Sequence, residues 1–241
     1  MLKDRLHKVI AASGVCSRRE AELLIADGRV SVNGKRVGKM GVKVSAEDEI
    51  RIDNQLLPEK APILTVAMHK PKGVLTSKSD PFHDKTVMDL LPADYAHLNP
   101  IGRLDKDSEG LLLFTSDGAL LEKLTHPRFG HEKVYHVLVH GIPTESELEE
   151  VRNGKLQLDG YTLQPMKAEV WKPEGNTTWL RMVLKEGRKR QIRRVMEIIK
   201  HPTIRLIRVA IGGVELGDLK PGEHRILSEN EVKLLQVPAD L

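Results

Sequence analysis

The spacing of apolar residues near the N-terminus predicts two short helices. Leu2, Leu6, Val9 and Ile10 repeat at helical intervals, which predicts a helix over residues 2–13. A second helix is expected to begin at Ser17, because Glu20 follows at the spacing of a capping box, in which the two residues satisfy free backbone N–H groups reciprocally. The Asp27-Gly28 pair is expected to end that helix.

A β-hairpin is predicted directly after these helices. Asn33-Gly34 tolerates the positive φ angles of a tight turn and lies in the middle of residues 30–37. One or two further strands follow within residues 43–52, and Asn54 to Pro62, with two prolines, has the composition of a linker. The pattern therefore divides the chain into a small module at residues 1–53, a linker at residues 54–62 and a larger domain at residues 63–241.

The larger domain mixes strands and helices without regular alternation. Strands are predicted at residues 63–68, 111–115, 132–141, 168–171, 177–184, 204–213 and within 219–227, with helices at residues 118–124, 144–153 and 229–236. The turn His69-Lys70-Pro71-Lys72-Gly73 is expected to end the first strand, and residues 173–176 are expected to form a turn. The pattern leaves open whether residues 87–91 are helix or strand. This mixture favours an α+β fold over a doubly wound parallel sheet.

An arginine-rich amphipathic helix is predicted to start near Arg188. Its apolar stripe consists of Ile192, Val195, Met196 and Ile199. Arg193 lies at the edge of this stripe, and a partly buried guanidinium requires a carboxylate partner. Arg188, Arg190 and Arg194 are left free to face water or phosphate.

The densest group of charges precedes the predicted strand at residues 111–115. Arg103, Asp105, Lys106, Asp107 and Glu109 follow one another closely, and Asp117 stands after the strand. A charged loop beside a buried strand is a favourable place for chemistry, because a rigid element positions the residues of the loop. From the pattern alone, a solvated turn whose charges neutralise one another explains the stretch equally well.

Charge and composition narrow the class of partner. The chain has a net charge of +4, but ten Lys/Arg stand against four Asp/Glu in residues 1–43, and nine against two in residues 185–208. Two separated basic clusters indicate a polyanion, with nucleic acid the obvious candidate. Aromatic residues are only 3% of the chain, which disfavours a surface that reads bases by rows of stacked rings. No apolar run is long enough for a membrane span, and a lone Cys16 fits a reducing cytoplasm.

Successive motifs of the larger domain resemble one enzyme family. These are Gly102-Arg-Leu-Asp-Lys-Asp-Ser-Glu-Gly-Leu-Leu-Leu-Phe-Thr-Ser-Asp-Gly118, Lys133-Val-Tyr135, Glu186-Gly-Arg-Lys-Arg-Gln-Ile-Arg-Arg194 and Leu206-Ile-Arg-Val-Ala-Ile-Gly212. In this order they resemble the bacterial ribosomal RNA pseudouridine synthases of the RsuA type. The resemblance implies a mixed, mostly antiparallel sheet with a central cleft, and isomerisation of a uridine in ribosomal RNA to pseudouridine.

The resemblance also implies roles for individual residues. Asp105 would be the essential carboxylate that initiates breakage of the uridine N-glycosidic bond, either as a nucleophile or as a base at the ribose. Tyr135 would pack against the target base, and Arg103 would hold the flipped nucleotide or fill the vacated stack. Arg193 would pair with Asp105, and Leu206 would line the pocket beneath. Such an isomerisation needs no cofactor, and no metal site is expected.

The N-terminal segment resembles a small RNA-binding module shared by a small-subunit ribosomal protein and several RNA-modifying enzymes. The resemblance rests on Ser13-Gly-Val-Cys-Ser-Arg-Arg-Glu-Ala21 and Gly28-Arg-Val-Ser-Val-Asn-Gly-Lys35. The residues expected to contact RNA, in this module and in the second basic cluster, are Arg18, Arg19, Arg29, Lys35, Arg36, Arg188, Lys189, Arg190 and Arg194. The expected partner is ribosomal RNA, free or in an assembly intermediate, with the large-subunit RNA favoured over the small, and the expected state is a monomer.

Two alternatives remain open at this point. A non-catalytic RNA-binding or ribosome-assembly factor could keep the same scaffold, although such a protein has no need of Asp105, Tyr135 and Arg193 together. A glycosidase acting on a free nucleoside is the weaker alternative, because a small substrate does not require a separate basic module.

Overall fold

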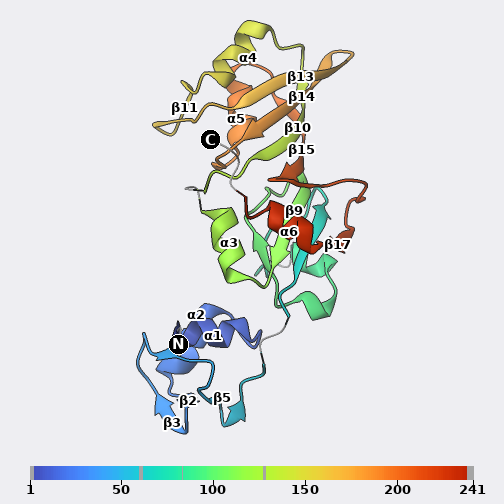
Figure 1. The fold of residues 1–241 in the computed structure, drawn as a ribbon. Helices are drawn as coiled ribbons and strands as arrows, with labels where there is room; N and C mark the ends of the chain where they lie inside the picture. The colour runs from blue at the N-terminus through green and yellow to red at the C-terminus, as the bar shows by residue number, and fades with distance from the viewer. Residues whose placement is uncertain (1–2, 60–61, 83, 127–128, 238–241) are drawn as a thin grey trace. The chain divides into compact units, whose positions relative to one another are not determined.

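The computed structural model describes residues 3–59, 62–82, 84–126 and 129–237, and the chain forms two compact units, Met1–Ile63 and Leu64–Leu241 (Figure 1). The predicted helix position Leu2 and part of the predicted linker lie outside the described residues. No helix in these ranges is long and apolar enough to cross a membrane.

The first unit pairs two helices with short strands around a small apolar core. Its elements are β1 (Asp4–Arg5), α1 (Leu6–Ala12), α2 (Arg18–Ala26), β2 (Val30–Val32), β3 (Lys35–Val37), β4 (Lys43–Val44), β5 (Ile50–Ile52) and β6 (Gln55–Leu56). The capping box of Ser17 and Glu20 is confirmed, and so is the hairpin, with φ of 50° at Asn33 and 75° at Gly34. The core is formed by Leu6, Ile10, Ala21, Ile25, Val30, Val44 and Ile50.

Two predictions for this unit are wrong in their details. The first helix begins at Leu6 rather than at residue 2, because Asp4 and Arg5 pair with β4 as a strand. Gln55 and Leu56 are not linker but form β6, antiparallel to β5. Asp53 and Asn54 both have positive φ and turn the chain back between these two strands.

The second unit is built on one mixed sheet with the strand order β13-β14-β10-β15-β9-β7-β17. The strands are β7 (Thr65–Lys70), β9 (Glu109–Thr115), β10 (Lys133–His140), β13 (Lys167–Glu174), β14 (Thr177–Leu184), β15 (Thr203–Ile211) and β17 (His224–Ile226), with β8 (Asn99–Ile101) beside β9 and β16 (Val214–Glu215) beside β15. All these pairings are antiparallel except that of β9 with β15. The predicted α+β fold with a mostly antiparallel sheet is confirmed.

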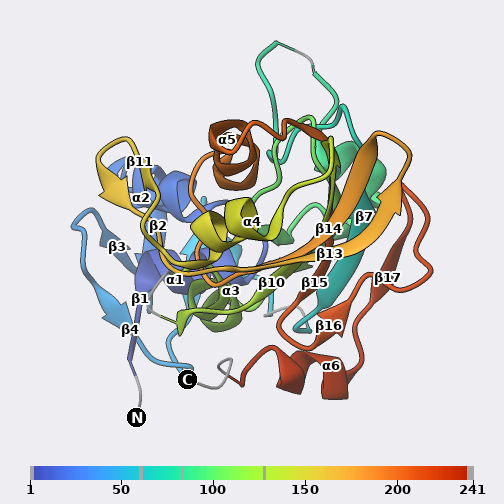
Figure 2. The same cartoon turned by 90° about the horizontal axis from the view of Figure 1, so that it is seen from above.

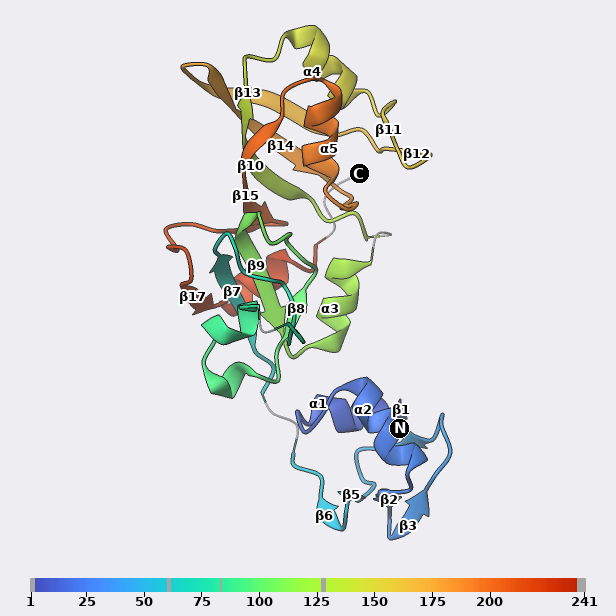
Figure 3. The same ribbon diagram turned by 180° about the vertical axis from the view of Figure 1, so that it is seen from behind.

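Helices cover the sheet in two halves. The helices α4 (Glu145–Arg152) and α5 (Gln191–Ile198) lie on one face of β10, β13, β14 and β15 (Figures 2 and 3) and share a core with them. The helices α3 (Gly118–Thr125) and α6 (Glu229–Leu234) belong to the other half, around β9. Shorter elements complete the unit: β11 (Gln157–Leu158), β12 (Tyr161–Thr162) and two 3-10 turns at Val87–Leu90 and Ala93–Tyr95.

The continuous apolar run of β9 is explained by burial on both faces of the sheet. Leu111 and Leu113 belong to the core under α3, whereas Leu112 and Phe114 belong to the core on the opposite face. All seven residues of β9 are buried. The predicted buried strand is therefore confirmed, and it extends back to Glu109. The element predicted at residues 87–91 as helix or strand is a 3-10 turn.

Several predicted boundaries differ from the structure, among them the following three. The strand β7 continues to Lys70 instead of stopping before it. The turn predicted at residues 173–176 is shorter, because β13 runs through Pro173; proline is tolerated there since β13 is an edge strand. The arginine-rich helix α5 starts at Gln191, because its N-cap Arg190 has a φ of 52° and cannot be part of the helix.

Candidate active site

A cavity of about 510 Å³ opens in the middle of the second unit. Its wall combines the loop between β8 and β9, the inner face of β10 and β15, and the segment that leads into α5. Four of the five residues predicted to form the reactive site, Arg103, Asp105, Tyr135 and Leu206, line this cavity. Other lining residues are Ser108, Lys133, Tyr161, Arg188, Lys189, Arg190, Ile192 and Arg208.

The loop that carries Asp105 is fixed from both sides by backbone contacts. The Thr76 hydroxyl donates to the Leu104 carbonyl at 2.8 Å and accepts from the Leu104 N–H at 3.2 Å. The Gly73 N–H donates to the Lys106 carbonyl at 2.7 Å, and the Ser108 N–H closes the turn on the Asp105 carbonyl at 3.0 Å. Asp105 itself is half-buried. Its carboxylate is thus presented to the cavity by a braced loop, as a positioned reactive group requires.

Beneath this loop lies Lys70, a residue that the sequence pattern did not single out. Its side chain is fully buried, and the ammonium donates to the carbonyls of Ser108 at 2.7 Å and Pro71 at 3.0 Å. Burial lowers the pKa of Lys70 to about 8, although the negative charges of Asp107, Asp105 and Glu109 offset part of that effect. Lys70 therefore supplies positive charge and one hydrogen bond, to the Ser108 carbonyl, at the base of the Asp105 loop.

We expect Lys70 to make the stability of the protein rise with pH between about 8 and 10.5. The folded state loses the Lys70 proton near its lowered pKa of about 8, whereas the unfolded chain keeps it up to about 10.5, so unfolding binds a proton in this window. In Lys70→Met this contribution is absent. The free energy of unfolding of the wild type should therefore gain up to about 3 kcal/mol relative to the variant across the window.

Urea unfolding of both proteins at pH 7.5, 9 and 10.5 measures this gain. Lys133, whose pKa is also lowered to about 8, is present in both proteins, so its contribution cancels in the difference. A difference that stays constant with pH would contradict the assignment.

Arg193 is buried as predicted, but its partner is not Asp105. The guanidinium lies 3.3 Å from the Asp107 carboxylate through Nε and donates to the Asp107 carbonyl at 2.9 Å. Arg190 reaches both oxygens of the same carboxylate at 3.0 Å. The predicted pairing of Arg193 with Asp105 is therefore wrong in this structure, because Asp107, two residues on, supplies the carboxylate that the buried guanidinium needs. Arg193 holds the loop and is not among the residues that line the cavity.

The inner face of β10 and β15 forms the floor of the cavity. Tyr135 stands opposite Arg208 in the strand register, and Val137 stands opposite Leu206. Tyr135 and Leu206 are buried with only one edge toward the cavity, at 9% and 7% exposed. The prediction that Tyr135, Val137 and Val139 share one inward face is confirmed by their burial.

Two cationic residues of this floor lie within the quoted motifs, but sequence reasoning gave them no role. The Arg208 side chain is 3% exposed; its Nε donates to the Leu111 carbonyl at 2.8 Å and its Nη1 to the Arg103 carbonyl at 3.4 Å. Lys133 donates to the His131 carbonyl at 3.1 Å, and burial together with the charge of Arg208 lowers its pKa to about 8. The available signal was the spacing Leu206-Arg208-Ala210, which places the arginine on a buried strand face.

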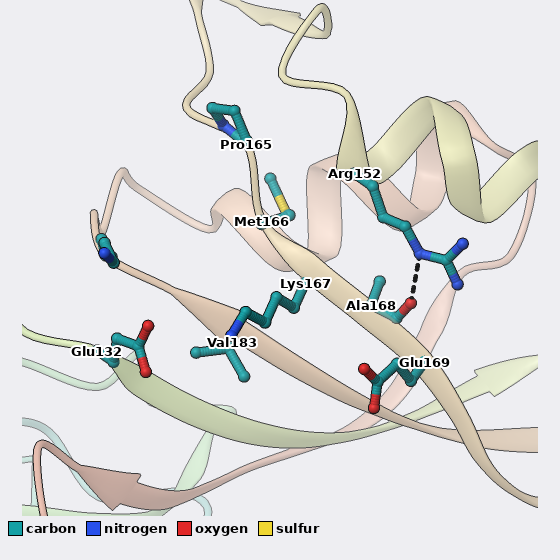
Figure 4. Close-up of a pocket in the computed structure, with 9 residues that line it drawn as sticks. Glu132, Arg152, Pro165, Met166, Lys167, Ala168, Glu169 and Val183 are labelled. Atoms are coloured by element: carbon teal, nitrogen blue, oxygen red, sulfur yellow. Dashed lines mark hydrogen bonds between the residues drawn. The ribbon is translucent and has the colours of Figure 1, made fainter. Parts of the chain in front are cut away.

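The predicted nucleic-acid contacts are exposed to different extents. Arg18, Arg19, Lys35 and Arg36 are exposed in the first unit, and Arg29 there pairs with Asp53. In the second unit Arg194 pairs with Asp159, and the Arg188 guanidinium lies 3.0 Å from the centroid of the Tyr161 ring. Arg188, Lys189 and Arg190 line the mouth of the cavity. A second cavity, of about 430 Å³, lies beside the edge strand β13, where Arg152 donates to the Ala168 carbonyl at 2.8 Å (Figure 4), and none of the predicted site residues lines it.

Comparisons with known proteins identify matches along nearly the whole chain. The family described as RNA pseudouridylate synthase matches residues 65–197, and the S4 domain family matches residues 4–50. The chain is 38% identical to the ribosomal large subunit pseudouridine synthase B of Bacillus subtilis, over 98% of this chain and 97% of that protein. It is 36% identical to the protein of the same name from Pseudomonas aeruginosa, over 96% of this chain and 61% of that protein. The crystal structure of a pseudouridylate synthase superposes with a TM-score of 0.70 at 29% identity, over 96% of this chain and 99% of the other.

Proposed function

The chain belongs to the RNA pseudouridine synthases and carries an S4 domain at its N-terminus, and on that premise we propose that it isomerises a uridine of large-subunit ribosomal RNA through Asp105. The observation that carries the proposal is that one cavity brings the Asp105 carboxylate together with Tyr135 and Leu206. A carboxylate and a flat aromatic wall are what an extruded nucleotide requires.

The reaction requires only groups that this cavity offers. The C1′–N1 glycosidic bond breaks, a bond forms between C1′ and C5 of the same base, the C5 proton leaves and N1 takes up a proton. The Asp105 carboxylate relieves the electron deficiency at C1′, either by bonding to it or by taking a proton from the ribose. Tyr135 packs against the base. No electrons enter or leave the substrate, so no redox group takes part.

Two arginines complete the site in different ways. Arg103 is exposed at the edge of the cavity, where its guanidinium can contact the extruded nucleotide or the stack that it vacates. Arg193 is a positioning residue, because its contacts with Asp107 fix the turn that presents Asp105. The exposed side chains of Arg188 and Lys189, with Arg190, give the mouth of the cavity the positive charge that a nucleic acid backbone needs.

The large-subunit assignment is supported by two relatives named as ribosomal large subunit pseudouridine synthases. The test is incubation of the full-length protein with large-subunit and small-subunit RNA transcribed with uridine tritiated at C5. Isomerisation releases that tritium to water. We expect release from the large-subunit RNA at one mapped position; release from the small-subunit RNA alone would overturn the assignment, and release from neither would favour an RNA-binding factor without catalysis.

We expect the S4 domain to bind the RNA backbone through Arg18 and Arg19. Both side chains are exposed at the start of α2, whose N-terminal N–H groups also attract anions. Replacing both with alanine should weaken binding of the full-length protein by about tenfold and lower the slope of log affinity against log salt by about 1–2. The measurement is a filter-binding titration between 50 and 300 mM salt.

The matched control is Arg51→Ala, which removes a partly exposed arginine of the same unit that pairs with Glu49. Its salt slope should equal that of the wild type. An unchanged slope in the Arg18/Arg19 double variant would exclude a backbone contact at these two residues.

A further inference from the structure

The floor of the cavity places two cations next to Tyr135. Arg208 is the direct register partner of Tyr135 on the neighbouring strand β15, so their side chains are nearest neighbours across the sheet. Lys133 precedes Tyr135 by two residues on β10, which puts it on the same face of that strand. All three residues line the cavity. A base that packs on Tyr135 therefore has two cationic side chains in its neighbourhood.

These two cations have no anionic partner. Within the part of the chain that the structure describes, neither Arg208 nor Lys133 makes an ion pair, and the protein atoms bonded to them are the carbonyl oxygens named above. The Nη2 nitrogen of Arg208 is buried and has no hydrogen-bond partner at all. Burying a cationic hydrogen-bond donor without a partner costs free energy, unless a ligand supplies the missing acceptor. The floor is thus arranged for an oxygen-rich or anionic group that enters with the substrate.

We propose that Arg208 and Lys133 bind the carbonyl oxygens of the target uracil and stabilise the negative charge that the base acquires when its glycosidic bond breaks. This inference rests on the proposed function. When the C1′–N1 bond breaks, its electron pair goes to the base and forms a uracil anion, while C1′ is satisfied by the Asp105 carboxylate or by loss of a ribose proton to it. The electron pair returns when C5 bonds to C1′, while the Asp105–C1′ bond breaks or the abstracted ribose proton is returned. The C5 proton then leaves and N1 takes up a proton, so the product is a neutral isomer of the substrate.

The location of these groups favours the base over a phosphate of the RNA backbone. A phosphate stays at the surface of the RNA and is matched by the exposed cations at the mouth, such as Arg103 and Lys189. Arg208 is instead buried beside the residue on which the base packs. Donors fixed in a site that excludes water act most strongly on charge that develops during the reaction.

The test compares two leaving groups. RNA carrying 5-fluorouridine at the target position forms a more stable base anion than RNA carrying uridine, because fluorine withdraws electrons. Breakage of its glycosidic bond therefore depends less on stabilisation of the base anion by the protein. We expect Arg208→Gln to slow single-turnover conversion of uridine by about 10²-fold and to slow conversion of 5-fluorouridine about tenfold or less. Since 5-fluorouridine has no C5 hydrogen, the readout is loss of the starting nucleoside in a complete digest of the RNA.

Lys133→Gln provides an independent second variant, with the same expected difference between substrates. Arg208 also donates a hydrogen bond to the Leu111 carbonyl, so Arg208→Gln can fail to fold. In that case Lys133→Gln alone tests the proposal. Arg181→Gln is the matched control: Arg181 is exposed on β14 and is absent from the cavity wall, so both rates should equal those of the wild type.

Equal losses on the two substrates would overturn the proposal and leave the cations a positioning role. Failure of the wild type on both substrates would instead overturn the proposed function, and the inference with it. The two failures are therefore distinguishable in one experiment.

Discussion

Replacing Asp105 with asparagine is expected to abolish isomerisation, lowering the single-turnover rate by at least about 10³-fold. The amide has the shape of the carboxylate but can neither bond to C1′ as an anion nor accept a ribose proton. The fold should be unchanged, because no ion pair among the described residues includes Asp105. RNA affinity should stay within about twofold of the wild type, since backbone contacts elsewhere dominate it. Tritium release and filter binding measure the two effects.

The matched control for this change lies in the same sequence motif. Asp117 caps α3 by accepting from the Ala119 N–H at 2.8 Å, and asparagine caps helices equally well. Asp117→Asn should therefore turn over at the wild-type rate with an unchanged fold. If Asp105→Asn also turned over normally, Asp105 would not be the essential carboxylate. If it lost RNA binding together with activity, the residue would serve binding rather than the reaction.

The features that could be predicted from the sequence depend on residues close together in the chain. The capping boxes at Ser17 and Thr144 and the Asn33-Gly34 turn formed where they were expected. Each of these signals is complete within four residues, so no tertiary contact is needed to interpret it. The burial of Arg193 could also be predicted, because the spacing of the apolar residues shows which face of the helix is apolar and Arg193 lies at its edge.

The partner of Arg193 could not be predicted, because several acids in one loop compete for it. Asp105 and Asp107 are two residues apart, and only the bend of the loop decides which carboxylate reaches the helix. The same limit applies to Lys70, whose burial depends on the Asp105 loop folding over it. The parallel pairing of β9 with β15 joins residues about a hundred positions apart, and no local pattern encodes its register. Sequence reasoning therefore selected residues that line one cavity, but not the neighbours that hold them in place.

That parallel pairing makes Gly110 the position where a single methyl group should be most damaging. Gly110 pairs with Arg208 at a φ of +109°, and a Cβ built there would lie 2.3 Å from the Arg208 carbonyl oxygen and 2.6 Å from its backbone nitrogen. Both obstacles are backbone atoms of β15, so relief requires the two strands to separate. We expect Gly110→Ala to lower the free energy of unfolding by about 4 kcal/mol or more, measured by urea unfolding.

The cost of the backbone conformation itself is isolated by Gly222→Ala. Gly222 has a φ of +90°, and a Cβ there would meet no atom within 4 Å, so this variant should lose only about 1–2 kcal/mol. Equal losses in the two variants would mean that the strands adjust freely and that their close approach is not a constraint. A much larger loss for Gly110→Ala would show that the junction of the two half-sheets, which sets Arg208 against the Asp105 loop, depends on a residue without a side chain.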